Sequence, residues 1–345
     1  MTFGITRRDA LFGLSSLSVL VAGDAGAVPD SVLTAARTEG TLTWYVAQVE
    51  GAKAEMLGKA FTAAHPGITV SVIRTTGQVA YQRLLLDIKN RTPQCDVFST
   101  TDISHMPVLK GRKELAEYIP DNAAAMVPAF KTRSDPGYFY ITNASRYLLL
   151  YNSARVKPED APKAWTDLLD PKWKGKVAMG HPAFSGCMGT WTLSLKKLYG
   201  WRFFEDLAKN NPRIGRSAAD PITLMSAGEC LVGPSSVAGA YLAIDRGNPL
   251  AVVHPSDGLV LCVTPSAIPI NAPHPNAARV FLDWMLSEQY SNLLAGDGAE
   301  PIREGVPTRP GVPLIATQKV IPMTTEELRT GVPEVIEQWR ETFGN

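Results

Sequence analysis

Short apolar runs alternate along the chain with longer runs whose apolar residues recur at helical spacing. Residues 41–47 and 96–99 are apolar and residues 69–74 alternate with β-branched side chains, so each run predicts a strand. Residues 53–64 and 79–90 place their apolar side chains on one face, as an amphipathic helix does. This β-α-β-α-β order predicts a parallel sheet with right-handed crossovers.

The order of these elements also indicates where a ligand would bind. In open parallel sheets, ligands bind beyond the carboxyl ends of the strands. The loops at those ends are residues 48–51, 75–78 and 100–104. We therefore expect these three loops to lie together at one edge of the sheet and to form part of a binding site.

A second α/β unit follows an extended central stretch. Residues 138–152 are rich in aromatic and aliphatic side chains and predict two strands. The later predicted strands are 176–179, 230–233, 251–254 and 259–265, and the later predicted helices are 189–208 with a break near Gly200, 221–227, 237–246, 275–294 and 325–343. Because more chain follows the second unit, we expect one lobe built from both ends of the chain and a second lobe inserted into it.

Three of the predicted helices begin with glycine and hydroxyl residues. Residues 181–190 read HPAFSGCMGT, and residues 75–78 and 234–236 have the same character. Such a start leaves backbone N–H groups and the positive end of the helix dipole free to face an anion. The alternative is ordinary capping with nothing bound, but three such starts at one site favour anion binding.

The first 27 residues are typical of an export signal. Arg7 and Arg8 precede an apolar run over residues 11–21, and residues 25–27 (AGA) offer a small-residue cleavage site near Ala27. The run is too short for a membrane-spanning helix. The string TRRDALF around the arginines resembles a twin-arginine signal, and an ordinary secretory signal is the alternative. Both predict export to the periplasm.

Composition and charge exclude several classes of partner. The 345 residues carry 34 basic and 33 acidic side chains, a net charge of +1, and are 45% hydrophobic. No basic excess or cluster points to nucleic acid. Four cysteines are too few for a disulfide scaffold. In an oxidising compartment they are either all buried thiols or include one bridge among Cys187, Cys230 and Cys262.

The common sequence motifs of catalysis and metal binding are missing from the chain. It has no GxSxG, GxxxxGK[ST] or HExxH motif, and its five histidines never recur at helical spacing. The SxxK match at residues 194–197 lies within a predicted helix and lacks its companion motifs. We therefore expect no enzyme activity, metal site or cofactor, with an exported hydrolase as the less favoured alternative.

Several longer strings together resemble one protein family. They are YN at 151–152, WTDL at 165–168, WKGK at 173–176, PAFSG at 182–186, HPSDG at 254–258, APHPNAA at 272–278 and FLDWMLSE at 281–288. The chain resembles the bacterial periplasmic solute-binding proteins of ABC importers, extracellular solute-binding family 1. That group includes binders of ferric ion, thiamine, sugar phosphates and phosphonates. The resemblance covers nearly all of the chain after the export signal.

The resemblance implies a type II periplasmic-binding-protein fold, an α/β fold with two lobes joined by hinge strands and a ligand cleft between them. Hinge strands would lie near residues 137–142 and 262–266, with lobe 1 at 28–138 plus 266–345 and lobe 2 at 139–265. The loaded, closed monomer would deliver a small molecule to a membrane permease. The positions that match the family's ligand loops are Gln48, Glu50, Thr76, Gly77, Gln78, Thr100, Thr101, Asp102, Ser185, Gly186, Ser235, Ser236, Tyr241, Asp257 and Arg303.

Ferric-ion members of the group carry adjacent tyrosines in the helix start after a Gly-Glu strand. Alignment on residues 228–229 places Ala238 and Gly239 at those positions, and neither offers an oxygen side chain. Tyr241 alone is a poor substitute. The sequence therefore disfavours iron as the solute.

The remaining chemistry favours a small organic anion, such as a carboxylate, phosphonate or phosphate ester, because hydroxyls, glycines and helix starts bind such groups. Four arginines are candidates for added positive charge: Arg74, Arg146, Arg216 and Arg303. Three acidic residues in the candidate loops favour a positively charged group instead, because they could bind an ammonium: Glu50, Asp102 and Asp257. A zwitterion, or a cation such as a polyamine or thiamine, is therefore the alternative.

Overall fold

The computed structural model describes Met1 and residues 28–344, so the predicted export signal, Met1 apart, lies outside the described residues. The first elements follow the predicted alternation: α1 (Asp30–Glu39), β1 (Thr41–Val46), α2 (Gly51–Ala64), β2 (Thr69–Arg74), α3 (Gly77–Asn90) and β3 (Val97–Ser99). Strand β1 pairs in parallel with both β2 and β3. The predicted parallel β-α-β-α-β unit is therefore confirmed.

Two long antiparallel strands, β4 (Tyr140–Asn152) and β9 (Val260–Ala267), form the centre of the molecule. The sheet has the order β2-β1-β3-β9-β4-β7, in which β7 is Val232–Ser236, and β8 (Leu250–Val253) also pairs with β4. Two strands were expected within residues 138–152, and this was wrong, because β4 is continuous. Its register with β9 shifts between Ile141 and Asn143, which interrupts the pairing without a turn.

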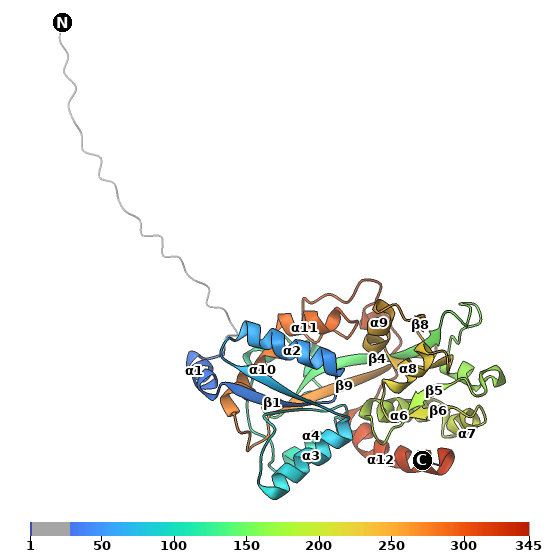
Figure 1. The fold of residues 1–345 in the computed structure, drawn as a ribbon, viewed down its shortest axis with the longest axis horizontal. Helices are drawn as coiled ribbons and strands as arrows, with labels where there is room; N and C mark the ends of the chain where they lie inside the picture. Colours follow the sequence, from blue (N-terminus) through green and yellow to red (C-terminus); the bar gives the residue numbers. More distant parts are fainter. Residues whose placement is uncertain (2–27, 345) are drawn as a thin grey trace.

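The second half of the chain supplies the elements to the right in Figure 1. In chain order they are β5 (Ala178–Gly180), α6 (Gly186–Tyr199), α7 (Arg202–Ala208), β6 (Arg213–Gly215), α8 (Asp220–Ser226), β7 (Val232–Ser236) and α9 (Val237–Asp245). Strands β5 and β6 form a separate two-stranded parallel sheet. The predicted break near Gly200 is confirmed, because this glycine separates α6 from α7 and has a left-handed φ of 71°.

The helix predicted over residues 275–294 is two helices, α10 (Pro275–Trp284) and α11 (Glu288–Ala295). The hydroxyl of Ser287 accepts a hydrogen bond from the Tyr290 N–H at 3.2 Å and caps α11. Shorter helices, α4 (His105–Gly111) and α5 (Pro128–Lys131), connect β3 to β4. The continuous prediction failed because the apolar pattern stays in phase across a capped break.

Two large hydrophobic cores lie at opposite ends of the central strands. Trp44, Phe61 and Phe281 belong to the first core, and Trp165 and Trp191 belong to the second. The strands β4 and β9 contribute side chains to both cores, as Figure 1 shows by their passage through the middle of the molecule. This arrangement is the α/β fold with two lobes joined by strands.

The C-terminal helix α12 (Thr325–Phe343) joins both cores, which differs from the expected placement of residues 266–345 in lobe 1. It packs against α6 and α7, and Trp339 lies in the second core, whereas Val332 lies in the first. An added Cβ on Gly189 of α6 would lie 2.8 Å from Val332, so the two helices approach closely there. The tail therefore bridges the lobes.

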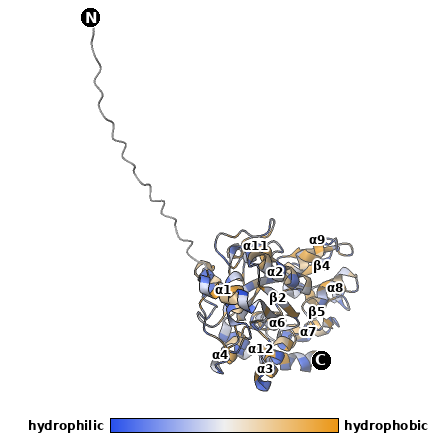
Figure 2. Ribbon diagram, turned by 60° about the vertical axis from the view of Figure 1, so that its left-hand side comes forward, coloured by the Kyte–Doolittle hydropathy of each residue, from blue (hydrophilic) through white to orange (hydrophobic). Residues whose placement is uncertain are grey.

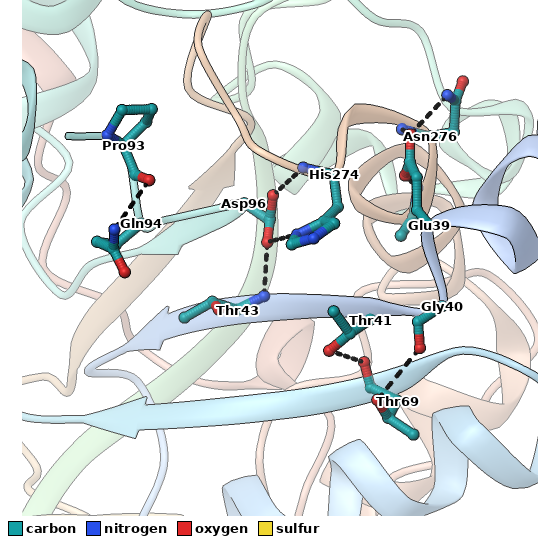
Figure 3. Close-up of polar contacts among 11 residues, drawn as sticks. Glu39, Gly40, Thr41, Thr43, Thr69, Pro93, Gln94, Asp96, His274 and Asn276 are labelled. Carbon is teal, nitrogen blue, oxygen red and sulfur yellow. Dashed lines mark hydrogen bonds and ion pairs between the residues drawn. The ribbon is translucent and has the colours of Figure 1, made fainter. Parts of the chain in front are cut away.

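Two carboxylates, one buried and one half-buried, hold the start of α10 against the first sheet (Figure 3). Asp96 is fully buried and accepts hydrogen bonds from the backbone N–H groups of Thr43 at 2.7 Å and His274 at 2.6 Å. Glu39 accepts from the side-chain amide and the backbone N–H of Asn276, at 2.7 and 3.2 Å. Both acids sit at the positive end of α10, where an anion is favoured.

In the described part of the chain, none of the helices could cross a membrane.

Candidate functional site

A cavity of about 120 Å³ lies where the two cores meet, and we call it the central cavity. Its walls come from the loop after β1, the start of α3, the loop after β3, the middle of β4 and the starts of α6 and α9. The predicted site residues that line it are Gln48, Glu50, Thr76, Gly77, Thr101, Ser185 and Ser236. Residues from all three loops predicted to meet at the sheet edge are therefore present.

The loop residues are held in place by contacts from other elements. The amide of Gln48 donates to the hydroxyl of Tyr290 at 3.0 Å, which fixes the loop after β1. The hydroxyl of Thr101 accepts a hydrogen bond from the Gly186 N–H at 3.2 Å, which joins the loop after β3 to the start of α6. Gly186 itself does not line the cavity but makes this contact at its edge.

Three predicted residues near β3 lie behind the cavity wall rather than in it. Asp102 accepts hydrogen bonds from the Gln78 amide at 3.1 Å and from the Ser104 N–H at 2.9 Å. The Thr100 hydroxyl pairs with Nδ1 of His105 at 2.9 Å. These contacts stabilise the loop that presents Thr101, so Gln78, Thr100 and Asp102 serve the site through their neighbours.

Asp257 and Arg303 lie outside the cavity lining and make structural contacts instead. Asp257 accepts from the Trp165 N–H at 2.7 Å and from the Tyr199 hydroxyl at 2.5 Å. Arg303 donates to the Asn122 side chain at 2.9 Å and to the Leu286 carbonyl. The matching of both positions to ligand loops therefore does not place their side chains at the cavity.

Ser235 and Tyr241 are also outside the lining. Ser235 is buried, and its hydroxyl donates to the Ser236 carbonyl at 3.2 Å. The guanidinium of Arg309 lies over the ring of Tyr241, 4.7 Å from the ring centroid, and the ring lies against Gly298. Tyr241 therefore connects α9 to the C-terminal segment.

Of the four arginines considered for positive charge, Arg74 lines the cavity. Arg146 is fully buried, pairs with the Glu300 carboxylate and donates to the Pro313 carbonyl at 2.8 Å. Arg216 lies over the ring of Phe184 at 4.9 Å, outside the cavity lining. Arg146 and Glu300 thus form a structural ion pair between β4 and the segment after α11.

The sequence analysis missed three cavity residues on β4, namely Asn143, Ser145 and Tyr147. They occupy alternate positions of the strand and therefore point to the same face. Tyr147 is almost fully buried, and burial raises the pKa of its phenol well above the usual range, so the hydroxyl stays protonated. The sequence N-A-S-R-Y does not distinguish the two faces of the strand, because Arg146 on the opposite face is polar as well.

Several polar atoms of the cavity wall have no hydrogen-bond partner. They are the hydroxyl oxygens of Thr76 and Ser145 and the amide oxygen of Asn143, all shielded from solvent. A buried polar atom without a partner costs about 1–3 kcal/mol of desolvation. Unpaired atoms are rare in native proteins, so three around one cavity indicate a place for a polar ligand.

Helix ends add positive potential to the same cavity. Ser185 caps α6 through the Met188 N–H, and Ser236 caps α9 through the Gly239 N–H. By contrast, no side chain caps α3 at Thr76 or α2 at Glu50. The first N–H groups of a helix lack partners inside it, and the helix dipole makes this end positive.

Charged side chains of the lining are arranged in opposite pairs. Lys53 binds Asp297 at 2.6 Å, and Arg74 lies 3.9 Å from Glu50.

One wall of the central cavity is apolar and includes Ile222, Leu242 and Leu294, with the mainly hydrophobic helix α9 visible in Figure 2. Ala238 and Gly239, the positions expected to correspond to the tyrosines of ferric-ion binders, also line the cavity. Within the described residues, no group of three or more His, Cys, Asp or Glu side chains could hold a metal ion.

A disulfide joins the cavity to the central strands. Cys187, in the first turn of α6, is bonded to Cys262 of β9, with a Cα–Cα distance of 5.4 Å. Cys95 and Cys230 are buried thiols. The structure thus has one bridge among the three cysteines considered, and it fixes the start of α6 to β9.

Comparisons with protein families and known proteins identify relatives of this chain. The model of the bacterial extracellular solute-binding protein family matches residues 95–318. An uncharacterised Haemophilus influenzae protein is 28% identical over 41% of this chain, and the match spans 42% of that protein. A Salmonella typhimurium protein, provisionally named a 2-aminoethylphosphonate-binding periplasmic protein, is 27% identical over 71% of this chain and 69% of its own.

Solved structures share the fold at low sequence identity. The periplasmic binding protein AfuA from Actinobacillus pleuropneumoniae, with fructose-6-phosphate bound, has a TM-score of 0.78 at 21% identity and covers 89% of this chain and 99% of its own. Iron-bound HitA from Pseudomonas aeruginosa has a TM-score of 0.74 at 22% identity, over 88% and 99%. The sequence-family match and the shared two-lobed fold lead to one conclusion: this chain belongs to the bacterial extracellular solute-binding protein family.

Proposed function

We propose that the protein captures a small solute with an anionic group in the central cavity and delivers it to an ABC permease of the inner membrane. The observation that carries the proposal is the start of α3. This helix has no side-chain cap, and the unpartnered Thr76 hydroxyl stands beside it in the cavity wall. An anionic oxygen there would accept from the free backbone N–H groups and from the hydroxyl.

The two-lobed fold supports a mechanism of capture by closure. The ligand would bind to one lobe first, and rotation about β4 and β9 would bring the other lobe onto it, as in hinge closure of binding proteins. The hydrogen bond from the Gly186 N–H to the Thr101 hydroxyl, at 3.2 Å in this structure, would be a contact of the closed form. The closed form would be the one that docks on the permease.

The family and the predicted signal support a periplasmic location and a transport role, with the protein acting as a monomer and without catalysis. Relatives named for 2-aminoethylphosphonate and a structural neighbour holding fructose-6-phosphate are both consistent with an anionic head group. Ferric ion is not favoured, because Ala238 and Gly239 provide no oxygen side chain at the cavity wall.

A thermal-shift panel tests the proposal. The mature protein would be unfolded and refolded once to remove carried ligand, then heated with carboxylates, phosphonates, sugar phosphates, polyamines, thiamine and ferric citrate. A ligand at 1,000 times its dissociation constant adds about 4 kcal/mol, or roughly 8–16 °C at about 2–4 °C per kcal/mol. Sodium chloride at equal ionic strength is the control. A shift confined to solutes with an anionic group is expected. A shift with polyamines alone, or with ferric ion alone, would contradict the proposal.

A further inference from the structure

One side chain of the cavity has an orientation fixed by its neighbour. Asn143 is 5% exposed, and its Nδ2 donates to the backbone carbonyl of Gln48 at 3.1 Å. A carbonyl oxygen can only accept, so the amide must present nitrogen to Gln48 and oxygen on its other side. That oxygen, Oδ1, has no partner, and Asn143 lines the central cavity.

The free Oδ1 accepts hydrogen bonds but cannot donate one. A fully ionised carboxylate or phosphonate offers only acceptor oxygens, so an anionic group alone would leave Oδ1 unpaired. The Ser145 hydroxyl, two residues along the same strand face, is unpartnered as well. This part of the wall therefore suits a ligand group that donates hydrogen bonds.

The charges of the lining favour an ammonium as that donor. Glu50 lies two residues after Gln48, the residue that holds Asn143, and it also lines the cavity. With Lys53 bound to Asp297 and Arg74 near Glu50, the four charges of the lining balance. A balanced wall suits a ligand that itself carries both signs. The apolar side chains of Ile222 and Leu242 would cover a short alkyl chain.

We propose that Asn143 is a specificity-determining residue that selects zwitterions, with the anionic group at the start of α3 and an ammonium at Oδ1 of Asn143. The inference rests on the proposed function, since it assumes that the central cavity binds the solute. It adds the class of solute, a zwitterion, and names Asn143 as the residue that recognises the ammonium of the solute.

Calorimetric titration with three phosphonates that share one head group tests this. The probes are 2-aminoethylphosphonate, 2-hydroxyethylphosphonate and propylphosphonate. The wild-type protein is expected to bind the amino compound about tenfold to a hundredfold more tightly than the propyl compound, as for a hydrogen bond to a charged group. Equal affinity for the amino and propyl compounds would overturn the inference. Equal affinity for the amino and hydroxy compounds would overturn the assignment of an ammonium.

Two variants at position 143 give opposite results if the inference holds. Asn143→Leu removes the acceptor and should bring the amino-to-propyl ratio close to one, while Asn143→Asp keeps an acceptor oxygen and should retain or raise the ratio. The ratio is the readout because damage to the fold lowers both affinities together. Ser145→Ala removes a hydroxyl without a protein partner and serves as a fold-safe second variant, expected to lower the ratio. An unchanged ratio in Asn143→Leu would contradict the role of this residue.

A parallel carboxylate pair, β-alanine and butanoate, separates this inference from the proposed function. If no phosphonate, carboxylate or other anion of the thermal-shift panel binds, the proposed function fails. If donor-free anions bind as tightly as their amino counterparts, the proposed function stands and only the role of Asn143 is contradicted.

Discussion

Gly186 and Thr101 meet at the edge of the central cavity, where the N–H of Gly186 donates to the Thr101 hydroxyl at 3.2 Å. A Cβ built on Gly186 would lie 2.2 Å from the Thr101 carbonyl oxygen and 2.6 Å from the Cα of Asp102. These are backbone atoms, so no side-chain rotation can relieve the clash. The first residue of α6 can therefore touch the loop after β3 only as glycine.

The first prediction follows from this contact. Gly186→Ala should hold the start of α6 away from Thr101 and lower ligand affinity about fivefold to 150-fold, because overpacking of this kind costs about 1–3 kcal/mol. Gly51→Ala is the matched control, since Gly51 is also the first residue of a helix and its added Cβ would meet nothing within 4 Å. Calorimetry measures affinity, and small-angle scattering measures closure. Normal closure of Gly186→Ala on ligand would show that the contact is not required.

The disulfide gives a second prediction. The bond between Cys187 and Cys262 closes a loop of 75 residues, so its loss should lower the free energy of unfolding by about 2–4 kcal/mol. Urea unfolding of Cys187→Ala/Cys262→Ala, with and without reductant, measures this. Reductant should destabilise the wild-type protein and leave the double variant unchanged, because Cys95 and Cys230 are already thiols. Four reactive thiols in the denatured, unreduced protein would rule out the bridge.

A third prediction separates binding from stability at Thr76. Its hydroxyl is buried without a partner, so Thr76→Val removes an unsatisfied group and should leave the ligand-free unfolding free energy unchanged or slightly higher. Ligand affinity should fall about tenfold, because a hydrogen bond to a charged group is lost. Denaturation without ligand and calorimetry with it provide the two numbers. A variant that loses stability but keeps its affinity would assign Thr76 a purely structural role.

The start of α12 gives a pH-dependent prediction. Lys197 at 2.6 Å, with the N–H and hydroxyl of Thr324, lowers the pKa of Glu327 from 4.5 to about 2. A depressed carboxyl pKa stabilises the fold above the unfolded pKa, and this contribution is lost as pH falls from about 4.5 through about 2. Glu327→Gln should therefore cost about 1 kcal/mol or less at pH 7, since the pair is partly exposed.

Urea unfolding between pH 7 and pH 2 follows this difference. The gap between wild type and Glu327→Gln should shrink as the pH is lowered. Glu341→Gln, at an exposed position of the same helix, should show no such change. A gap that stays constant to pH 2 would mean that the Glu327 contacts do not contribute.

Local pattern was sufficient for the first parallel unit, because each strand and helix there has a single apolar face or a short apolar run. It failed where the decisive information is not local. The apolar residues stay in phase across the helix break at Ser287, so hydrophobicity does not mark the end of α10. Strand β4 is continuous where it passes from one core to the other, so the pattern of hydrophobicity does not predict that passage either. The N-cap serine at 287 is the signal that would have divided the helix.

For the site, the rule that ligands lie beyond strand ends correctly brought Gln48, Thr76 and Thr101 together at one cavity. It could not place Asp257 or Arg303, because their partners are distant in the sequence: Asp257 holds Trp165, and Arg303 holds Asn122. Side chains on β4 were missed for a related reason, since both faces of a central strand are buried and only tertiary packing decides which one meets the cavity.

A crystal structure of the refolded protein grown with the tightest anion of the thermal-shift panel tests the central claim most directly. The account predicts density in the central cavity, with the anionic group on the first backbone N–H groups of α3 and within hydrogen-bond distance of the Thr76 hydroxyl. A ligand bound elsewhere, or one whose anionic group faces away from the start of α3, would contradict it.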